Sequence, residues 1–245
     1  MMDLKTILLL LSWPDLLSAV FTILCWGGVG WHVEHPRQSR PSVNRLMRRY
    51  RREWMLNNID RSPRVHDATL LGSLRDGTAF FASACLIAIG GALALIGNTD
   101  RLDRVAEELN MGPTPAILWE VKILLPLLLI TNAFMKFVWS HRVFGYCSVM
   151  MGAIPNDEQS AEARSRALMA AELNIEAARS YNRGLRSVYF ALGALGWLLG
   201  PGALVLTTLV TTATIWHREF ASASRRLLLA GPTDEALRDM ERDNP

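Results

Sequence analysis

The chain has 245 residues, half of them apolar and 20% charged, with a formal net charge of +3. Charged and apolar residues are segregated, and almost uncharged segments of about 18 to 28 residues are long enough to span a hydrocarbon core of about 30 Å. This segregation excludes an ordinary water-soluble domain and a disordered chain. The three cysteines lie far apart in the sequence, which excludes a disulfide scaffold. The composition therefore predicts an all-α integral membrane protein.

Four apolar segments predict a bundle of four transmembrane helices. These spans cover about residues 14–32, 78–97, 119–139 and 188–216. The first segment has a competing interpretation as a cleaved signal peptide, but no small-x-small cleavage site follows it. Trp119 and Trp139 lie at the two ends of the third segment, where an aromatic belt at the membrane interfaces is expected. Gly200-Pro201-Gly202 interrupts the fourth, which we interpret as a kinked span, with a re-entrant hairpin as the alternative.

Two long connections between the apolar segments carry most of the arginines. Ten lie in residues 32–77 and five in residues 140–185, against two in residues 98–118. Arginine makes up 23 of the 26 basic residues, a bias typical of GC-rich bacterial genomes, so we predict a protein of the bacterial cytoplasmic (inner) membrane. Because cytoplasmic loops are rich in Lys and Arg, its long loops should be cytoplasmic and both of its termini periplasmic. Arg218, Arg225 and Arg226 conflict with this topology, since they follow the last span closely. A re-entrant hairpin would remove the conflict.

The long connections contain two predicted helices, at about residues 42–59 and 157–182. In the first, apolar residues recur at helical spacing and arginines occupy the remaining surface. We expect an amphipathic helix on the cytoplasmic leaflet with anionic lipid as its partner, and packing against another protein element is the alternative. The candidate anionic-lipid contacts are Arg45, Arg48, Arg49, Arg51, Arg52, Arg142, Arg183 and Arg186. Residues 1–230 then form a single membrane domain, and residues 231–245 form a polar tail.

Polar side chains inside a span are unfavourable in lipid, so they mark candidate functional positions. Four side chains of the third span fall on one helical stripe, namely Lys122, Asn132, Lys136 and Trp139. This stripe should face the interior of the bundle. We predict that it is anchored by two ion pairs, Asp15–Lys122 and Asp76–Lys136. The alternative is a polar track for a proton, an ion or a substrate headgroup.

No catalytic signature is present in the sequence. It contains no Walker-type phosphate loop, no GxGxxG after a strand pattern, no HExxH and no GxSxG. A metal site from His32, His35 and His141, completed by Asp67, is conceivable, but interfacial histidines are usually unliganded. We therefore predict no enzyme, no metal and no cofactor. Nucleic acid is not a predicted partner, because the membrane surface is the nearer polyanion for the arginine cluster.

Seven separated blocks of sequence carry a resemblance to a known family. They are NRLMRRYRREWM (44–55), RVHDATLLGSLRDGTAFFAS (64–83), LWEVK (118–122), AFMKFVWSHR (133–142), GAIP (152–155), NRGLRSVYFALGALGWLLGP (182–201) and REFAS (218–222). From about residue 13 to residue 226, the chain resembles the bacterial members of an uncharacterised membrane-protein family, domain of unknown function 599. The resemblance implies a small multi-pass membrane protein and no particular activity.

The expected function is a non-enzymatic interaction, assembly or accessory module whose basic loops lie on the inner leaflet. Its partners would be the lipid bilayer and a second copy or another membrane protein. A small oligomeric transporter or channel that uses the third-span stripe is the first alternative. The second is a membrane enzyme that binds a lipid headgroup through His141, Arg142, Arg183 and Arg186. A cavity that reaches both Asn132 and Lys136 would favour transport, whereas a dry interior with paired charges would favour a structural role.

Overall fold

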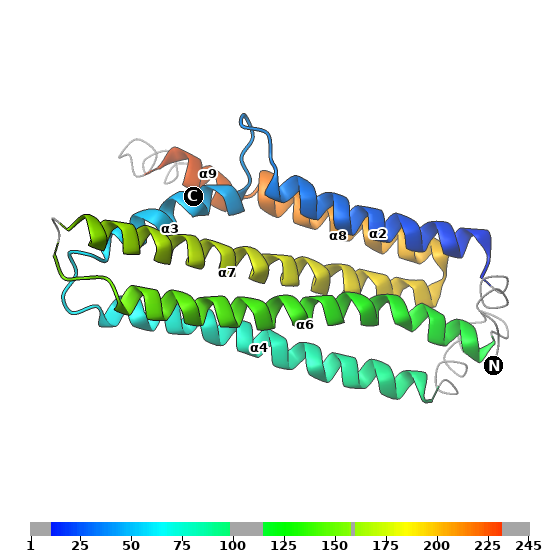
Figure 1. Ribbon diagram of the computed structural model, residues 1–245. Helices are drawn as coiled ribbons and strands as arrows, with labels where there is room; N and C mark the ends of the chain where they lie inside the picture. The colour runs from blue at the N-terminus through cyan, green and yellow to red at the C-terminus, as the bar shows by residue number, and fades with distance from the viewer. Residues whose placement is uncertain (1–10, 99–114, 158–159, 232–245) are drawn as a thin grey trace, which may run out of the picture.

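The computed structural model describes residues 11–98, 115–157 and 160–231, and every regular element within these ranges is helical (Figure 1). The helices are α2 (Trp13–Glu34), α3 (Val43–Asn57), α4 (Val65–Ile96), α6 (Ala116–Gly152), α7 (Ala161–Ala194), the 3-10 helix η1 (Leu195–Leu199), α8 (Pro201–Phe220) and α9 (Ala223–Ala230). The predicted all-α class is confirmed. The polar tail from residue 232 onward lies outside the described residues.

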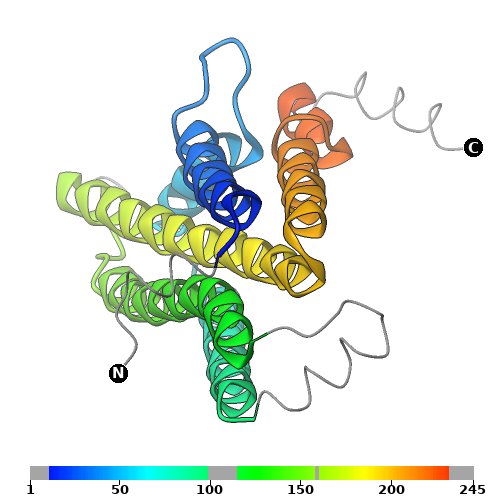
Figure 2. The same cartoon turned by 90° about the vertical axis from the view of Figure 1, so that its right-hand side faces the viewer.

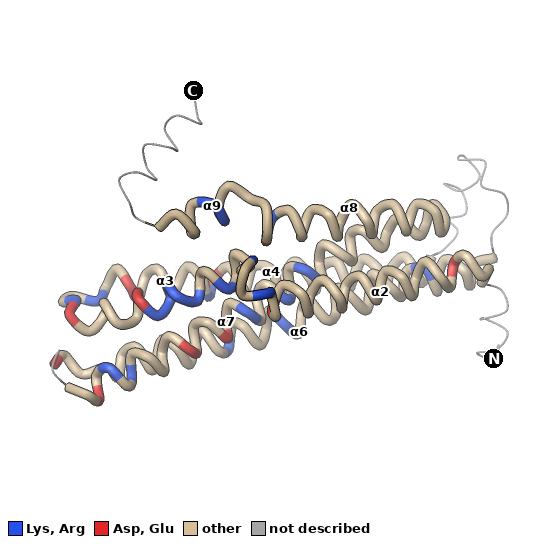
Figure 3. Tube along the Cα trace, turned by 90° about the horizontal axis from the view of Figure 1, so that it is seen from above, with Lys and Arg blue, Asp and Glu red and all other residues tan. Residues whose placement is uncertain are grey.

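Helix α7 lies at the centre of an elongated bundle. Viewed along the bundle, α2 and α8 lie on one side of α7, and α6 and α4 lie on the other (Figure 2). Among the described helices, α2, α4 and α6 are long and apolar enough to cross a membrane. Charged residues gather on α3, α9 and the first part of α7, in one half of the bundle (Figure 3). The nearly uncharged half is the part suited to a hydrocarbon environment.

The fourth apolar segment is a helical hairpin, so its interpretation as one kinked span is wrong. Helix η1 ends at Leu199, Gly200 has a φ of +113°, and Pro201 begins α8, which returns alongside α7 and α2. Glycine reaches a positive φ without steric penalty, and proline suits the first helical position. Helix α8 therefore starts near the end of the bundle where α2 begins and runs back toward the charged half (Figure 1).

The two predicted loop helices are both present, but each is integrated into the bundle. Helix α3 packs against α7, with Met55 fully buried. Nη1 of Arg51 donates a hydrogen bond to Oδ1 of Asn174, and Nε of Arg52 lies 2.7 Å from Oε1 of Glu172. Packing against protein, the alternative for this helix, is therefore found. The helix predicted at 157–182 is the first part of the longer α7.

Close packing of α7 on α6 aligns the polar side chains of the two helices. Six alanines of α7 are buried in a core cluster with residues of α6, α3 and α4, namely Ala163, Ala167, Ala170, Ala171, Ala177 and Ala178. At Gly184, an added Cβ would lie 2.7 Å from the ring of Phe137. Ser180 Oγ donates to the carbonyl oxygen of Lys136 at 3.0 Å. Small residues allow such close helix approach, and here they place Lys136 at the same level as the arginines of α7.

Candidate functional site

A basic cleft of about 360 Å³ lies between α2, α6 and α7. Its lining residues are Trp26, Gly27, Gly30, Trp31, Glu34, His35, Asn132, Lys136, Arg183, Arg186 and Ser187. We refer to this set as the basic cleft. It brings together two residues of the predicted third-span stripe, Asn132 and Lys136, with two of the predicted lipid-contact arginines. The sequence did not predict that these two groups share a cavity.

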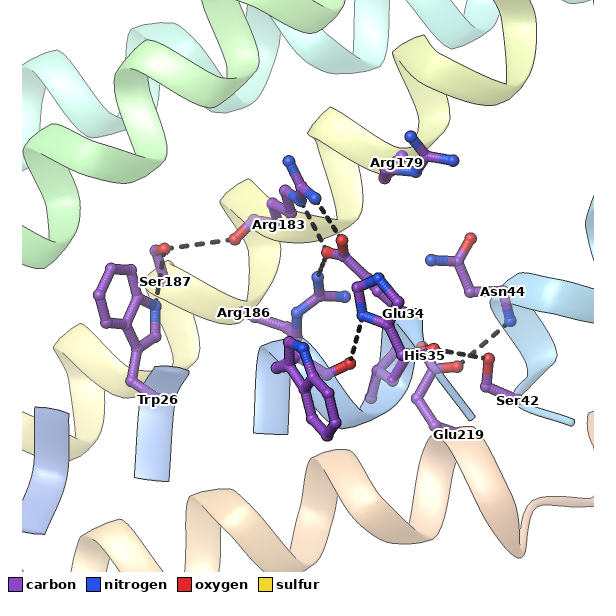
Figure 4. Close-up of polar contacts among 12 residues, drawn as sticks. Trp26, Glu34, His35, Ser42, Asn44, Arg179, Arg183, Arg186, Ser187 and Glu219 are labelled. Carbon is purple, nitrogen blue, oxygen red and sulfur yellow. Dashed lines mark hydrogen bonds and ion pairs between the residues drawn. The ribbon is translucent and has the colours of Figure 1, made fainter. Parts of the chain in front are cut away.

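The arginines of the basic cleft belong to a stripe along α7. Arg179, Arg183 and Arg186 are spaced i, i+4 and i+7, so their side chains lie on one face of the helix. This face meets the last turn of α2, where Glu34 is the acceptor (Figure 4). The carboxylate was missed in the sequence analysis. A usable signal existed, because Glu34 is the one acidic residue between Asp15 and Glu53.

Glu34 holds two arginines with one carboxylate. Nε of Arg183 donates to Oε1 of Glu34 at 2.7 Å, and Nη2 of Arg183 donates to Oε2 (Figure 4). Nη2 of Arg186 donates to Oε1 at 2.7 Å. The side chains of Glu34 and Arg186 are 9% and 7% exposed, whereas that of Arg183 is 41% exposed. Arg183 therefore keeps an accessible side for a ligand, whereas the buried Arg186 mainly pairs with Glu34.

A chain of neutral hydrogen bonds links three of the residues that line the cleft. Nε1 of Trp26 donates to Oγ of Ser187 at 3.1 Å (Figure 4). Ser187 Oγ lies 3.2 Å from Oδ1 of Asn132 and 3.2 Å from the carbonyl oxygen of Arg183. These bonds orient side chains from three helices without using any charge. The cationic groups of the cleft are therefore not neutralised from this side.

Lys136 is the cation of the cleft that lacks a counter-ion. Its side chain is half-buried, and no ion pair between described residues includes its ammonium group. With Arg183 and Arg186 sharing Glu34, the charged lining has a positive excess. A half-buried ammonium group without an anion is unfavourable, which favours an anionic ligand at this position.

The helix ends beside the cleft are joined by further polar contacts. The backbone N–H of Asn44 donates to Oε2 of Glu219 at 3.2 Å, and Oγ of Ser42 donates to the carbonyl oxygen of Val33 at 2.9 Å (Figure 4). These contacts join α3 to the ends of α8 and α2. Glu219 was also missed in the sequence analysis, because it lies beyond the apolar segment. Its position near Arg186 depends on the return of α8 along the bundle.

Neither predicted ion pair forms between these described residues. Asp15 accepts a hydrogen bond of 2.8 Å from Nε1 of Trp197, because η1 and α8 lie beside α2 at this end. Lys122 is buried with its Nζ 5.3 Å from the ring centre of Trp119.

Asp76 is exposed on α4. Helix α4 packs on one face of α6, whereas Lys136 enters the cleft from a different face of α6. Trp139, the last residue of the predicted stripe, is 49% exposed and does not line the cleft. The stripe is therefore divided. Only Asn132 and Lys136 reach the cleft, because the partner helices change along the length of α6.

The remaining predicted lipid contacts differ in their surroundings. Nη1 of Arg45 donates to the carbonyl oxygen of Pro36 at 3.1 Å. Arg49 forms an exposed ion pair of 2.7 Å with Glu53. Arg142 donates to the hydroxyl of Tyr146, and its guanidinium lies 5.8 Å from the ring centre.

The histidines considered for a metal site have other contacts. His32 stacks on Trp216 with the ring centres 4.9 Å apart. His141 Nδ1 lies 3.2 Å from Oγ1 of Thr78. Within the described part of the chain, no group of three or more His, Cys, Asp or Glu side chains is placed to hold a metal ion.

Comparison with known proteins identifies the family. No curated protein and no solved structure matches the chain. A family model described as "Protein of unknown function, DUF599" matches residues 17–224. All seven sequence blocks that carry the resemblance fall within that range. The chain therefore belongs to the DUF599 family of proteins of unknown function.

Proposed function

We propose that this protein is a non-enzymatic component of the bacterial cytoplasmic membrane that binds the anionic headgroup of a lipid in its basic cleft. The observation that carries the proposal is the unpaired ammonium group of Lys136 in a cavity that Arg183 and Arg186 also line. Phosphate oxygens form strong charge-assisted hydrogen bonds with both groups. The proposal keeps the accessory role expected from the sequence and assigns anionic lipid as the partner.

The proposed topology has five crossings. Helices α2, α4 and α6 would each cross the membrane once. Each arm of the hairpin would add one crossing. The first arm is the end of α7 together with η1, and the second arm is α8. The arginine-rich end of the bundle would then be cytoplasmic. Arg218, Arg225 and Arg226 lie at this same end, so the conflict in the four-span prediction disappears.

The walls of the cleft suit a lipid at the level of its headgroup. Trp26 and Trp31 line it from α2, and tryptophan is favoured at membrane interfaces. Gly27 and Gly30 lie on the same face of α2 and leave room beside the helix. Helices α2 and α6 pack mainly against other helices, so the cleft between them is open to a lipid from one side.

Transport receives less support from this geometry. A cleft that reaches Asn132 and Lys136 was the feature expected of a transporter. However, Lys122 lies about 21 Å from Lys136 along α6 and packs against Trp119, so a continuous polar track is not supported. A headgroup enzyme is also less well supported, because His141 and Arg142 do not line the cleft.

The experiment is a lipid-binding measurement on the full chain in mild detergent. Dissociation constants for phosphatidylglycerol and phosphatidylcholine would be measured by native mass spectrometry for the wild type and for Lys136→Gln. We expect the wild type to prefer phosphatidylglycerol and Lys136→Gln to bind it about tenfold more weakly, since one charged hydrogen bond is lost. Arg49→Gln, which removes an exposed charge on α3, is the matched control. Equal binding of the two lipids by the wild type would refute the proposal.

A further inference from the structure

A second pair of cations lies one helical turn beyond the basic cleft. Arg48 of α3 forms no hydrogen bond or ion pair with any described residue, and its Nε is buried without a partner. Nε of Arg179 on α7 is buried and unpartnered in the same way, although Nη1 of this residue pairs with Glu176 at 2.5 Å. Two guanidinium groups from facing helices thus have unused donors.

The electrostatic surroundings of Arg48 are unfavourable for its charge. Burial lowers the pKa of the Arg48 guanidinium, and the positive charge of Arg179 lowers that pKa further. Arg45 and Arg52 add repulsion, and Glu34 is the one negative charge that opposes it. Helix α3 packs on α7, where Arg52 pairs with Glu172, and Arg48 lies one turn before Arg52 on α3. Nearby guanidinium groups in a partly buried position repel, and an anion between them converts this repulsion into attraction.

The position between Arg48 and Arg179 is adjacent to the cleft. Arg179 and Arg183 are spaced i and i+4 on α7, which separates them by about 6 Å along the helix axis. Arg183 has an accessible side chain at the mouth of the cleft, and Arg179 continues the same face toward the charged end of the bundle. This separation matches the spacing of two closely linked anionic groups on one ligand.

We infer that the ligand of the basic cleft carries two phosphate groups, one held by Lys136 with Arg183 and the other by Arg48 with Arg179. This inference rests on the proposed function. Lys136 and Arg48 are two cations without ion-pair partners among the described residues, and two phosphodiester groups supply two negative charges. Basic pockets at the cytoplasmic side of membrane helices suit lipids of this kind.

The test compares lipids that differ in the number of phosphates. Cardiolipin carries two phosphodiester groups and phosphatidylglycerol carries one, and both would be titrated onto the full chain in detergent. We expect the wild type to bind cardiolipin at least about tenfold more tightly. Arg48→Gln and Arg179→Gln should each abolish this preference and leave phosphatidylglycerol binding unchanged. Arg48→Lys should keep part of the preference, and Arg49→Gln should keep all of it.

The outcomes separate the two proposals. If phosphatidylglycerol binds and depends on Lys136, but Arg48→Gln leaves the cardiolipin preference intact, the second phosphate position is refuted and the first stands. If neither lipid binds the wild type, the proposed function itself fails. Inorganic pyrophosphate distinguishes a soluble ligand from a lipid. If pyrophosphate binds in a manner that depends on Arg48 and neither lipid binds, the assignment to lipid is overturned. Should Arg48→Gln fail to fold, Arg48→Lys and Arg179→Gln carry the test.

Discussion

Arg186 of α7 donates a hydrogen bond of 2.7 Å to Glu34 of α2 across a sequence separation of 152 residues. Both side chains are nearly buried, and Arg183 shares the same carboxylate. This contact joins α2, with its attached α3, to the central helix of the bundle. It also sets the position of Arg183 at the mouth of the basic cleft, so the stability of the bundle and the geometry of the cleft depend on one carboxylate.

Glu34→Gln should destabilise the protein, because a buried Arg186 would lose its counter-charge. We expect the free energy of unfolding to fall by about 3 kcal/mol, measured by denaturant titration in detergent. The combined variant Glu34→Gln with Arg186→Met should recover part of this loss, since no unpaired buried charge remains. Glu53→Gln, in an exposed pair with Arg49, should change stability by less than about 0.5 kcal/mol. A loss below about 1 kcal/mol for Glu34→Gln would contradict the assignment.

The hairpin of α7 and α8 should not tolerate a side chain at Gly196. An added Cβ would lie 2.6 Å from Oγ1 of Thr207 and 3.1 Å from the carbonyl oxygen of Ala203. Thr207 is held by a hydrogen bond of 2.7 Å to the carbonyl oxygen of Gly193, so it cannot move freely. Gly196→Ala should lower the melting temperature and cost about 1–3 kcal/mol of stability.

The control for this substitution is Gly90→Ala in α4, where an added Cβ meets no atom within 4 Å. Alanine favours the helix over glycine, so this variant should be neutral or slightly stabilising. Equal melting temperatures for the two variants would argue against close contact between the hairpin arms. Gly90 therefore does not share the close packing that is found at Gly196.

Arg64 should stabilise two helix ends at the charged end of the bundle. Its guanidinium donates to the carbonyl oxygens of Asn58, Ile59 and Ile154 at 3.0, 3.2 and 2.8 Å. These carbonyls follow the ends of α3 and α6, where no intrahelical donor is available. Arg64→Met should lower the free energy of unfolding by about 2 kcal/mol and speed hydrogen exchange at residues 57–60 and 152–155.

Lysine lacks the planar set of N–H donors that arginine has, so Arg64→Lys should restore only part of the protection against hydrogen exchange. Arg37→Met, at an exposed position, is the matched control. Unchanged exchange at both helix ends in Arg64→Met would show that these carbonyls are held by other groups.

The proposed topology makes a direct prediction for reporter fusions. Reporters inserted at residue 155 and after Ala230 should both be cytoplasmic, because α7 and α8 form a hairpin that returns to its starting side. A reporter at residue 98, after α4, should lie on the opposite side. Cysteine labelling with a membrane-impermeant reagent at the same positions checks the result. Reporters at 155 and after Ala230 on opposite sides would restore the four-span topology.

Local sequence features were sufficient to place most helices. Helix α3 was expected at 42–59 and covers Val43–Asn57, with the side chain of Ser42 accepting a hydrogen bond from the N–H of Arg45. Helix-capping side chains and apolar spacing act within a few residues, so they can be recognised without knowledge of the fold. The same holds for the apolar segments, whose length is set by local composition.

The candidate site was only partly predictable. The position of Lys136 inside an apolar helix marked it as a candidate functional residue, and the structure places it in the basic cleft. Its expected partner Asp76 is exposed on α4 instead, because helical spacing identifies the face of a residue but not the neighbouring helix on that face.

The amino-acid sequence by itself determined the all-α class, the apolar segments and the charged end of the bundle, because each follows from side-chain chemistry over short stretches of chain. Only the tertiary structure decided that Gly200-Pro201 is a turn, since a glycine–proline pair permits either a kink or a reversal. Packing of α8 against α7 and α2 selects the reversal. The meeting of Glu34 with Arg183 and Arg186 follows from that packing, because it joins residues that local forces cannot bring together.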